Sequence, residues 1–446
     1  MKLTFFGGIK EVTGANYLLE SGSTKILIDC GLKQGGAFAD ESNWDPLPYD
    51  IKTISAVLVT HAHIDHTGRL PYLIKNGFQG TVYSTPPTKD FAELLLFDSE
   101  SILHREAERN KREPLYLADD VLRLMKRWEG VEYYRSFNIG DFKITFYNAG
   151  HILGSSIIAI EAEGKKVLFT GDMGNNPPPI IKGTDFLNEA DYCIIESAYG
   201  SRIHEPVKEG VIEDLIEDVT KSKGVLMIPA FAMERTQKIL YEMHDLFREG
   251  RVPQIPVFLD SPLAIEVTDI YKNYKEYFNA ETLKEMKDHF LLFDFRSLTK
   301  TLTTEESKSI NSVPPPKIII AGSGMSQGGR IIHHELRYLS DPNSIILFVG
   351  YQTKGSLGRR ILEGEPIVKI KGEEVRVRCR IVQIENFSAH ADQKQLLSWV
   401  EPMRSTLRKV FVVQGDEDGS VVLAQKISDE LVVHTEIPEF GKVYEL

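Results

Sequence analysis

The sequence predicts an α/β protein in which a domain of stacked β-sheets covered by helices is interrupted by an inserted parallel-sheet α/β domain. Three changes of pattern along the 446 residues predict this order. Short β-type runs dominate residues 1–203, apolar strands alternate with amphipathic helices over 204–375, and β-type runs return over 376–446. The chain also exceeds the size of one ordinary hydrophobic core, which agrees with more than one domain.

The first part of the chain begins with short strand-like runs. "KLTFFGG", "NYLLE", "KILIDCG" and "ISAVLVT" are rich in β-branched and aromatic residues and are separated by Gly, Ser, Thr and Pro. Residues 90–128 carry apolar residues at helical spacing, so we expect helix there. Strands return at "FKITFYNAG", "SSIIAIEAEG", "KKVLFTGD" and "YCIIES". This order predicts stacked sheets with helices outside them.

The inserted part reads as repeated strand–loop–helix units. "GVLMIPA" leads into "ERTQKILYEMHDLF", "PVFLD" into "LAIEVTDIYKNY", and "KIIIAGSG" into "GGRIIHHELRYL", before "SIILFVGY". Units of this kind connect parallel strands and place helices on both faces of a sheet. The run "EEVRVRCRIVQI", a helix and "KVFVVQGDED" then indicate a return to the first domain.

Composition narrows the class of protein. Hydrophobic residues make up 42% and charged residues 26%, as in ordinary globular domains. The net charge of −12 argues against a broad basic face for nucleic acid, although it allows a local basic groove. Cys30, Cys193 and Cys379 are far apart and odd in number, so we expect buried free thiols. With no signal peptide and no apolar run near the roughly 20 residues of a membrane span, we expect a cytoplasmic protein.

The run "LVTHAHIDHTGRLP" places four metal-capable side chains at the tip of a predicted strand. His61 and His63 point the same way in an extended loop, and Asp65 and His66 follow as the chain turns into a helix near Gly68. Imidazoles with a carboxylate favour zinc over magnesium or calcium, and two ligand pairs suit two adjacent metals. The alternative is a set of hydrogen-bonded polar residues at a strand end, but the narrow spacing favours a metal site.

Two later stretches have the character of further ligands. "NAGHILGSS" places His151 in a glycine-flanked turn, and "VLFTGDMGN" places Asp172 at a strand tip, where it can bridge two metals. Taken singly, each is more simply a satisfied polar residue. Asp29 ends the strand "ILIDCG", and we expect it to hold the histidine loop by hydrogen bonds from behind the ligands.

These motifs resemble a known family. H-x-H-x-D-H, then G-H-x-x-G-S, then T-G-D resemble the metallo-β-lactamase superfamily. Further stretches resemble its β-CASP branch of zinc-dependent nucleases, which process RNA and in some members DNA. They are "IIESAYGSRIH" with Glu196, Arg202 and His204, "IPAFAMERTQKIL" with Arg235, and "FSAHADQKQ" with His390.

The resemblance covers nearly the whole chain, and it implies an αββα metallo-β-lactamase fold with an inserted β-CASP domain. Within the branch, the chain is similar to compact prokaryotic RNA-processing nucleases related to the pre-mRNA 3′-end processing endonuclease. It shows neither the KH modules nor the extra C-terminal domain of longer relatives.

By position, the resemblance implies two zinc ions with a shared ligand. The implied ligands are His61, His63 and His151 for the first zinc, Asp65 and His66 for the second, and Asp172 between them. The residues expected to take part in catalysis are Asp65, Glu196 and His390. His390 would lie near the scissile phosphate, with Glu196 hydrogen-bonded to it.

The sequence departs from the family at one ligand position. The family usually ends a late strand with a histidine that ligates the second zinc, but "FVVQGDEDG" has Gln414 there. A neutral amide oxygen is a poorer zinc ligand than imidazole, so we expect weaker binding of the second zinc. Asp416 or Glu417 can compensate if either reaches the metal.

The resemblance implies a zinc-dependent ribonuclease that cuts as an endonuclease, and it leaves open a second, 5′ to 3′ exonucleolytic mode. Its nucleophile would be a metal-bound hydroxide, His390 would be the general acid, and the products would carry 5′-phosphate and 3′-hydroxyl ends. Single-stranded RNA is the expected partner, with DNA as an alternative, no membrane, and a homodimer as a family-level expectation.

Three alternatives stay open. Gln414 keeps an RNA-binding pseudo-nuclease in consideration. The second alternative is a small-molecule metallo-hydrolase, although this function leaves the inserted domain unexplained. "FSAHAD" taken alone also fits a helix N-cap at Ser388, with His390 on the surface.

Glycine-rich loops are the expected RNA contacts. "AGSGMSQGGRIIHHEL" follows a strand and opens a helix, so its backbone N–H groups can cradle a phosphate. "GYQTKGSLGRR" adds basic side chains in a second such loop. Tight turns and a solvated surface are the alternative interpretations. The candidate substrate-binding residues are Arg235, Ser323, Arg330, His333 and Lys354.

Overall fold

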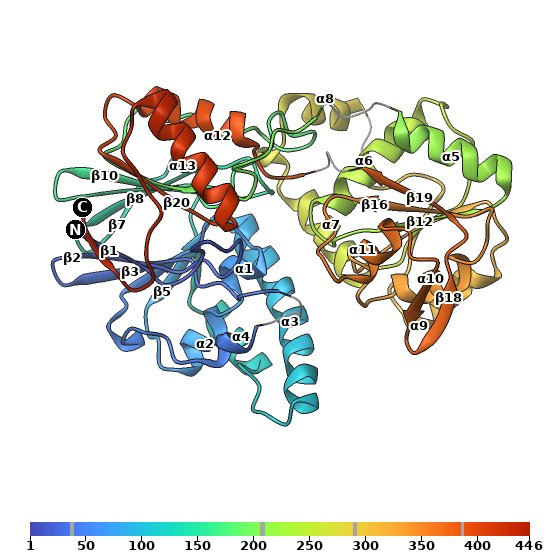
Figure 1. Cartoon of the computed structure of the whole chain (residues 1–446), viewed down its shortest axis with the longest axis horizontal. Helices are drawn as coiled ribbons and strands as arrows, with labels where there is room; N and C mark the ends of the chain where they lie inside the picture. Colours follow the sequence, from blue (N-terminus) through green and yellow to red (C-terminus); the bar gives the residue numbers. More distant parts are fainter. Residues whose placement is uncertain (36–39, 206–209, 289–291, 385–387) are drawn as a thin grey trace. The chain divides into compact units, whose positions relative to one another are not determined.

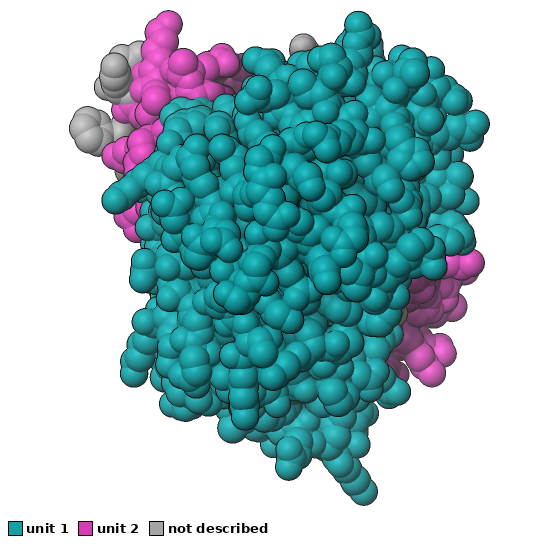
Figure 2. All heavy atoms as spheres, turned by 90° about the vertical axis from the view of Figure 1, so that its left-hand side faces the viewer, with its two compact units in different colours: residues 1–204, 389–446 teal, residues 205–388 magenta. Residues whose placement is uncertain are grey.

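The computed structural model of the chain describes residues 1–35, 40–205, 210–288, 292–384 and 388–446 (Figure 1). It divides into unit 1, Met1–His204 with Ala389–Leu446, and unit 2, Glu205–Ser388, which are coloured separately in Figure 2. Unit 2 extends past the expected boundary at 375/376. The reason is that strand β19 (Arg380–Ile384) pairs in parallel with β16 (Ile345–Val349), which places β19 in the compact unit of that sheet.

Unit 1 contains two mixed sheets, as the stacked-sheet pattern predicts. In the order of the first sheet, its strands are β22 (Val443–Glu445), β1 (Lys2–Phe5), β2 (Tyr17–Ser21), β3 (Thr24–Ile28), β4 (Ala56–Leu58), β5 (Thr81–Ser84) and β6 (Trp128–Gly130). In the second, they are β21 (Thr435–Glu436), β20 (Lys409–Val413), β11 (Tyr192–Glu196), β10 (Lys165–Phe169), β9 (Ser156–Ala162), β8 (Phe142–Asn148) and β7 (Phe137–Ile139).

The inner faces of the two sheets share one core. Leu3 and Ile26 from the first sheet pack in the same buried cluster as Phe146, Ile158 and Phe169 from the second. These side chains alternate along their strands with residues on the outer faces, because successive side chains of a strand point to opposite sides. Burial of this apolar surface holds the two sheets face to face.

Helices cover the outer faces of both sheets. The helices of unit 1 are α1 (Ile64–Thr67), α2 (Leu70–Lys75), α3 (Pro86–Arg109), α4 (Ala118–Met125), α12 (Gln393–Val400) and α13 (Glu417–Leu431). Trp399 of α12 and Leu423 of α13 pack against Ile195 and Val412 of the second sheet. In Figure 1, α1 to α4 lie on the far side of the first sheet. The expected αββα order is therefore confirmed.

The helical pattern over residues 90–128 forms two helices and not one. Between α3 and α4 the chain makes turns over residues 110–117, where Pro114 does not favour a continuous helix. At its other end, α3 begins at Pro86, where proline fits the first helical turn.

Unit 2 is built on an all-parallel sheet, as predicted. Its strands, in order, are β14 (Leu298–Lys300), β13 (Val257–Leu259), β15 (Lys317–Ala321), β12 (Val225–Pro229), β16 and β19. Strands β12, β15 and β16 are buried along their whole length, which is typical of parallel sheets covered on both faces. The helices are α5 (Val211–Ser222), α6 (Arg235–Arg248), α7 (Pro262–Asn273), α8 (Ala280–Asp288), α9 (Thr304–Ser309), α10 (Ile331–Tyr338) and α11 (Leu357–Leu362), beside a hairpin of β17 (Ile367–Ile370) and β18 (Glu373–Arg376).

The cysteine prediction is confirmed, because all three thiols are free and buried. Among the described residues, no helix combines the length and apolar character that crossing a bilayer requires.

Candidate functional site

The histidine run forms a tight loop between β4 and α1. Strand β4 ends at Leu58, and α1 begins at Ile64, so the loop leaves the carboxyl end of a buried strand. Gly31 packs directly beneath it, since a Cβ atom there would lie 1.5 Å from the carbonyl oxygen of Asp65. Glycine is therefore required where the chain passes under this loop.

A first group of four donor atoms converges at this loop. Nε2 of His61 lies 3.0 Å from Nδ1 of His63, which lies 3.2 Å from Nε2 of His151. Oδ2 of Asp172 lies 3.5 Å from the His61 nitrogen and 3.7 Å from the His151 nitrogen. A tetrahedral zinc ion with bonds of about 2.0–2.1 Å separates its ligand atoms by roughly 3.3–3.4 Å. The four side chains therefore suit one tetrahedral zinc.

A second group shares Asp172 with the first. Its other oxygen, Oδ1, lies 3.4 Å from Nε2 of His66, and Oδ2 of Asp65 lies 3.8 Å from the same nitrogen. The three side chains offer donor atoms that all lie within 4.8 Å of one another. Asp172 thus turns one carboxylate oxygen to each group, which is the arrangement of a bridging ligand.

Asp29 supports this loop from behind, at a strand end where its φ is +58°. Its Oδ2 lies 2.7 Å from Nδ1 of His66, and its Oδ1 accepts the backbone N–H of Thr60 at 2.8 Å. The Thr60 hydroxyl also donates to Asp29 and lies 3.1 Å from Nδ1 of His61. Asp29 therefore orients His66 with its Nε2 toward the second group. Thr60 was missed in the sequence, because a threonine after a strand carries no distinct signal.

Burial and neighbouring charges shift the pKa values of the histidines in opposite directions in the two groups. Burial lowers the pKa of His61 and of His151 well below the usual value, which keeps both rings neutral with a lone pair for a metal. Burial also acts to lower the pKa of His66, but Asp172, Asp29 and Asp65 outweigh it and raise this pKa well above the usual value. The second group is thus rich in negative charge, which a bound cation would neutralise.

Gln414 lies at the second group, at the end of β20. Its Nε2 lies 3.2 Å from Nε2 of His66 and donates to the carbonyl of Val12 at 2.9 Å, while its Oε1 accepts the Tyr17 hydroxyl at 3.2 Å. If the amide oxygen and nitrogen exchanged places, the amide oxygen would face the carbonyl oxygen of Val12, and two acceptors cannot form a hydrogen bond. The amide therefore turns its NH₂ toward His66, and an amide NH₂ has no lone pair for a metal.

The suggested compensation for Gln414 by its neighbours was wrong. Asp416 caps α13 by accepting the N–H of Gly419 at 2.7 Å. Glu417 is largely exposed and pairs with Lys10 at 2.6 Å. Neither belongs to a metal-capable group found among the described residues.

His390 and Glu196 form a pair beside the first group. Nδ1 of His390 lies 3.3 Å from both carboxylate oxygens of Glu196 and 3.9 Å from Oδ2 of Asp172. Glu196 is fully buried and also accepts the backbone N–H of Met173 at 2.6 Å. The structure therefore brings together the two residues that the sequence places 194 positions apart.

The surroundings of His390 show why it is positioned here. Gly174 forms an isolated bridge with His390, so the return segment docks on the Asp172 loop. The ring of Tyr199 stacks on His390 at 5.9 Å between ring centres, and Nε2 of His204 lies 2.9 Å from the His390 carbonyl. Tyr199 was missed, although it follows Glu196 by three positions.

The alternative in which Ser388 caps a helix was wrong. Asp392 is the N-cap of α12 and forms a capping box with Gln395, so the helix begins at Gln393. His390 therefore lies in the loop before the helix, and its side chain is 21% exposed.

The candidate substrate residues lie in unit 2. Arg330 donates to Asp260 and to the carbonyls of Thr301 and Leu302, so its guanidinium is engaged within the fold. The Ser323 hydroxyl accepts the N–H of Gln327 at 3.1 Å. His333 and Lys354 are exposed, and Arg235 is mostly buried.

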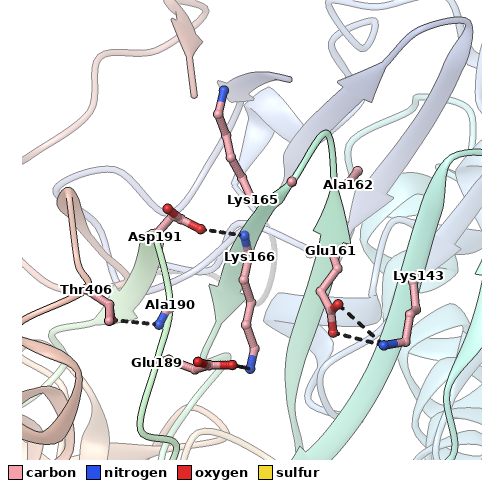
Figure 3. A pocket seen from close by; sticks show the side chains of 10 residues that line it. Lys143, Glu161, Ala162, Lys165, Lys166, Glu189, Ala190, Asp191 and Thr406 are labelled. Carbon is pink, nitrogen blue, oxygen red and sulfur yellow. Dashed lines mark hydrogen bonds and ion pairs between the residues drawn. The ribbon is translucent and has the colours of Figure 1, made fainter.

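A separate hollow of about 590 Å³ lies on unit 1 along β8, β9 and β10 (Figure 3). Two of its three lysines pair with carboxylates, Lys143 with Glu161 at 3.2 Å and Lys166 with Glu189 at 3.5 Å, and Lys165 donates to the Leu446 carbonyl oxygen. Balanced charges of this kind make a poor site for an anionic ligand. The hollow shares no residue with the histidine–aspartate groups.

Comparison with protein families covers most of the chain. A metallo-beta-lactamase superfamily domain matches residues 18–198, and a Beta-Casp domain matches residues 236–361. A Zn-dependent metallo-hydrolase RNA specificity domain matches residues 374–438.

Similar proteins extend over nearly the full length. Ribonuclease TTHA0252 of Thermus thermophilus is 37% identical over 96% of both chains, and an RNase J-like protein of Methanocaldococcus jannaschii is 31% identical over 99% of both. Transcription termination factor FttA of Methanosarcina mazei is 32% identical over 98% of this chain and 70% of its own. A crystal structure of a protein of unknown function from Enterococcus faecalis covers 100% of this chain and 99% of its own, with a TM-score of 0.55 and 12% identity, a likeness of fold alone.

Proposed function

The chain belongs to the β-CASP RNA-processing nucleases of the metallo-β-lactamase superfamily, and we propose that it is a zinc-dependent ribonuclease acting at the histidine–aspartate cluster of unit 1. One observation carries this proposal. Asp172 directs Oδ2 toward His61 and His151 and Oδ1 toward His66, so a single carboxylate joins two donor groups.

The two groups fit zinc unequally. The first offers three imidazole nitrogens and one carboxylate oxygen, a complete tetrahedral set. The second offers Asp65, His66 and Asp172, and Gln414 adds only an NH₂ group. Zinc in these sites would acidify a water molecule and neutralise charge on the phosphate oxygens. We therefore propose one tightly bound zinc and a second that is held more weakly.

The protein's own proton donor for the reaction is His390. Hydrolysis breaks the bond between phosphorus and the 3′-oxygen, and that oxygen needs a proton as it leaves. Glu196 accepts from Nδ1 of His390, which stabilises the protonated ring and leaves Nε2 as the nitrogen that delivers the proton. Oxygen from water remains on phosphorus, so the products carry a 5′-phosphate and a 3′-hydroxyl.

Asp65 has a second role in this proposal besides ligation. Burial raises the pKa of its carboxyl above the usual value, and a bound cation would favour the ionised form that ligates. Its position beside His66 and Asp172 lets it hydrogen-bond the attacking water.

We propose single-stranded RNA as the substrate, cut internally, with trimming from the 5′ end as a second mode. The RNA specificity domain match and the ribonuclease relatives support RNA over small molecules. In unit 2, exposed His333 and Lys354 and the loop of Ser323 are proposed to contact the RNA backbone, whereas Arg330 is better explained as a structural residue.

The test is incubation of the zinc-loaded protein with an unstructured RNA labelled at its 5′ end, with a chelator-treated sample as control. The expected result is internal cleavage in the zinc sample alone, with 5′-phosphate ends on the downstream products. Binding of intact RNA without cleavage would instead identify a pseudo-nuclease, the alternative that Gln414 leaves open. Turnover of a lactam or thioester without RNA cleavage would identify a small-molecule hydrolase.

A further inference from the structure

The sheet of unit 2 has a topological switch point between β12 and β16. These strands are neighbours, and the chain leaves β12 toward β13, away from β16, and leaves β16 toward β19, away from β12. Loops that depart in opposite directions from adjacent parallel strands separate beyond the carboxyl ends of those strands. Open α/β sheets bind their ligands at such points.

Three loops meet at this switch point: residues 230–234, 322–330 and 350–356. Gln352 donates to the carbonyl of Gly324 at 2.9 Å, and the Thr353 hydroxyl lies 3.2 Å from the sulfur of Met325. The backbone N–H of Ala230 donates to Ala321 at 3.0 Å. We call these segments the switch-point loops.

Phe231 lies in the switch-point loops, and its exposed aromatic ring packs on a glycine. Its ring lies against Gly324, where a Cβ atom would be 2.7 Å from a ring carbon. Phe231 nevertheless keeps 40% of its surface exposed. One part of the ring is therefore supported by backbone while another faces solvent, which is the arrangement of a stacking platform.

Arg235 carries a positive charge next to this platform, at the start of α6. Its guanidinium lies against Gly350, where a Cβ atom would be 3.3 Å from Cζ. Nε is 3.3 Å from Glu234, but the buried Nη1 has no hydrogen-bond partner among the described residues. The side chain keeps 15% of its surface exposed, and a phosphate oxygen is a strong acceptor for a guanidinium N–H.

We propose that the switch-point loops of unit 2 bind one nucleotide of the RNA, with its base stacked on Phe231 and a neighbouring phosphate on Arg235. This inference rests on the proposed function, because it assigns a substrate subsite to the same enzyme. Stacking on a phenylalanine accepts every base, so the site holds the strand without selecting its sequence. It requires an unpaired base, which favours single strands over duplexes.

The test measures binding of a fluorescent, unstructured RNA of twelve nucleotides to the full chain in the presence of a chelator, which prevents cleavage. A second RNA of the same length carries no bases. Phe231→Leu should weaken binding of the parent RNA about 5- to 150-fold, the range for loss of one stacked base. The unaltered protein should bind the abasic RNA more weakly than the parent RNA, and Phe231→Leu should bind the abasic RNA as tightly as the unaltered protein does.

Two further variants separate stacking from folding. Phe231→Trp keeps an aromatic surface and should retain both the affinity and the abasic penalty. Phe186→Leu, which changes a phenylalanine that is 53% exposed in unit 1, should bind like the unaltered protein. A structural effect alone would weaken all RNAs equally and leave the abasic penalty in place, which would overturn the inference.

Equal affinity of Phe231→Leu and the unaltered protein would also overturn it. The proposed function is judged separately, by zinc-dependent cleavage with the unaltered protein. Cleavage together with unchanged Phe231→Leu binding removes only the subsite, whereas absence of both binding and cleavage removes the function and the subsite together.

Discussion

Gln414 sets the NH₂ of its side chain 3.2 Å from Nε2 of His66, the nitrogen that faces the second donor group. Val12 and Tyr17 hold the amide in this orientation through hydrogen bonds at its two ends. The two metal groups therefore share Asp172 but differ in their number of protein ligands.

Replacement of Gln414 by histidine should convert the second group into a four-ligand site. The expected result is close to two zinc ions per chain after dialysis, against close to one for the unaltered protein, because imidazole supplies the missing lone pair. Zinc content is measured by atomic absorption. Gln414→Leu is the control and should remain near one ion. Two ions retained by the unaltered protein would show that three ligands suffice.

Asp29→Asn should loosen His66. The carboxylate accepts from Nδ1 of His66 at 2.7 Å, and an amide is a weaker acceptor for this ring. Loss of such an outer hydrogen bond typically lowers metal affinity about 10- to 100-fold. Competition with a chelating indicator measures the affinity of the second group, which contains His66, for zinc. Asp119→Asn, at an exposed position on α4, is the control. An affinity equal to that of the control would contradict the role assigned to Asp29.

Glu335 in α10 should make the stability of unit 2 depend on pH. Burial raises the pKa of its carboxyl from 4.5 to about 7, and Oε2 has no hydrogen-bond partner among the described residues. Because the folded state favours the protonated form, this contribution to stability is complete below pH 4.5 and is lost as the pH rises through 7. The shift corresponds to about 3 kcal/mol at 1.36 kcal/mol per pKa unit.

Glu335→Gln should remove that dependence, since the amide stays neutral. Urea unfolding should show the variant more stable than the unaltered protein at pH 8, by up to about 3 kcal/mol, with little difference at pH 4.5. Glu374→Gln, on the exposed face of β18, is the control. An advantage that is equal at both pH values would mean that the pKa of Glu335 is the same in the folded and unfolded states, which contradicts the prediction.

The sequence predicts the parts of the site that are local or that follow strand ends. The six-position cluster from His61 to His66 signals itself by spacing, and Asp29 and Asp172 each end an apolar run. Strand ends gather at one edge of a sheet, so these residues meet once the sheets stack. The structure places them together as the pattern predicts.

The sequence does not predict contacts between residues that are far apart in the chain. The orientation of Gln414 depends on Val12 and Tyr17, about 400 positions earlier, and no periodicity reports such a contact. The sheet that β19 joins depends on such a contact as well. The apolar residues of β19 are typical of a strand but do not say which sheet it joins, and pairing with β16 decides that.

The most direct measurement is single-turnover cleavage of a 5′-labelled, unstructured RNA by the zinc-loaded protein and by His390→Ala, with the zinc content of each determined beforehand. We expect equal zinc content and a rate about 10²- to 10⁴-fold lower in the variant, because His390 lies outside both zinc groups and donates a proton. His104→Ala, on α3, should cleave at the unaltered rate. A His390→Ala protein that cleaves as fast as the control, or that has lost zinc, would contradict this assignment.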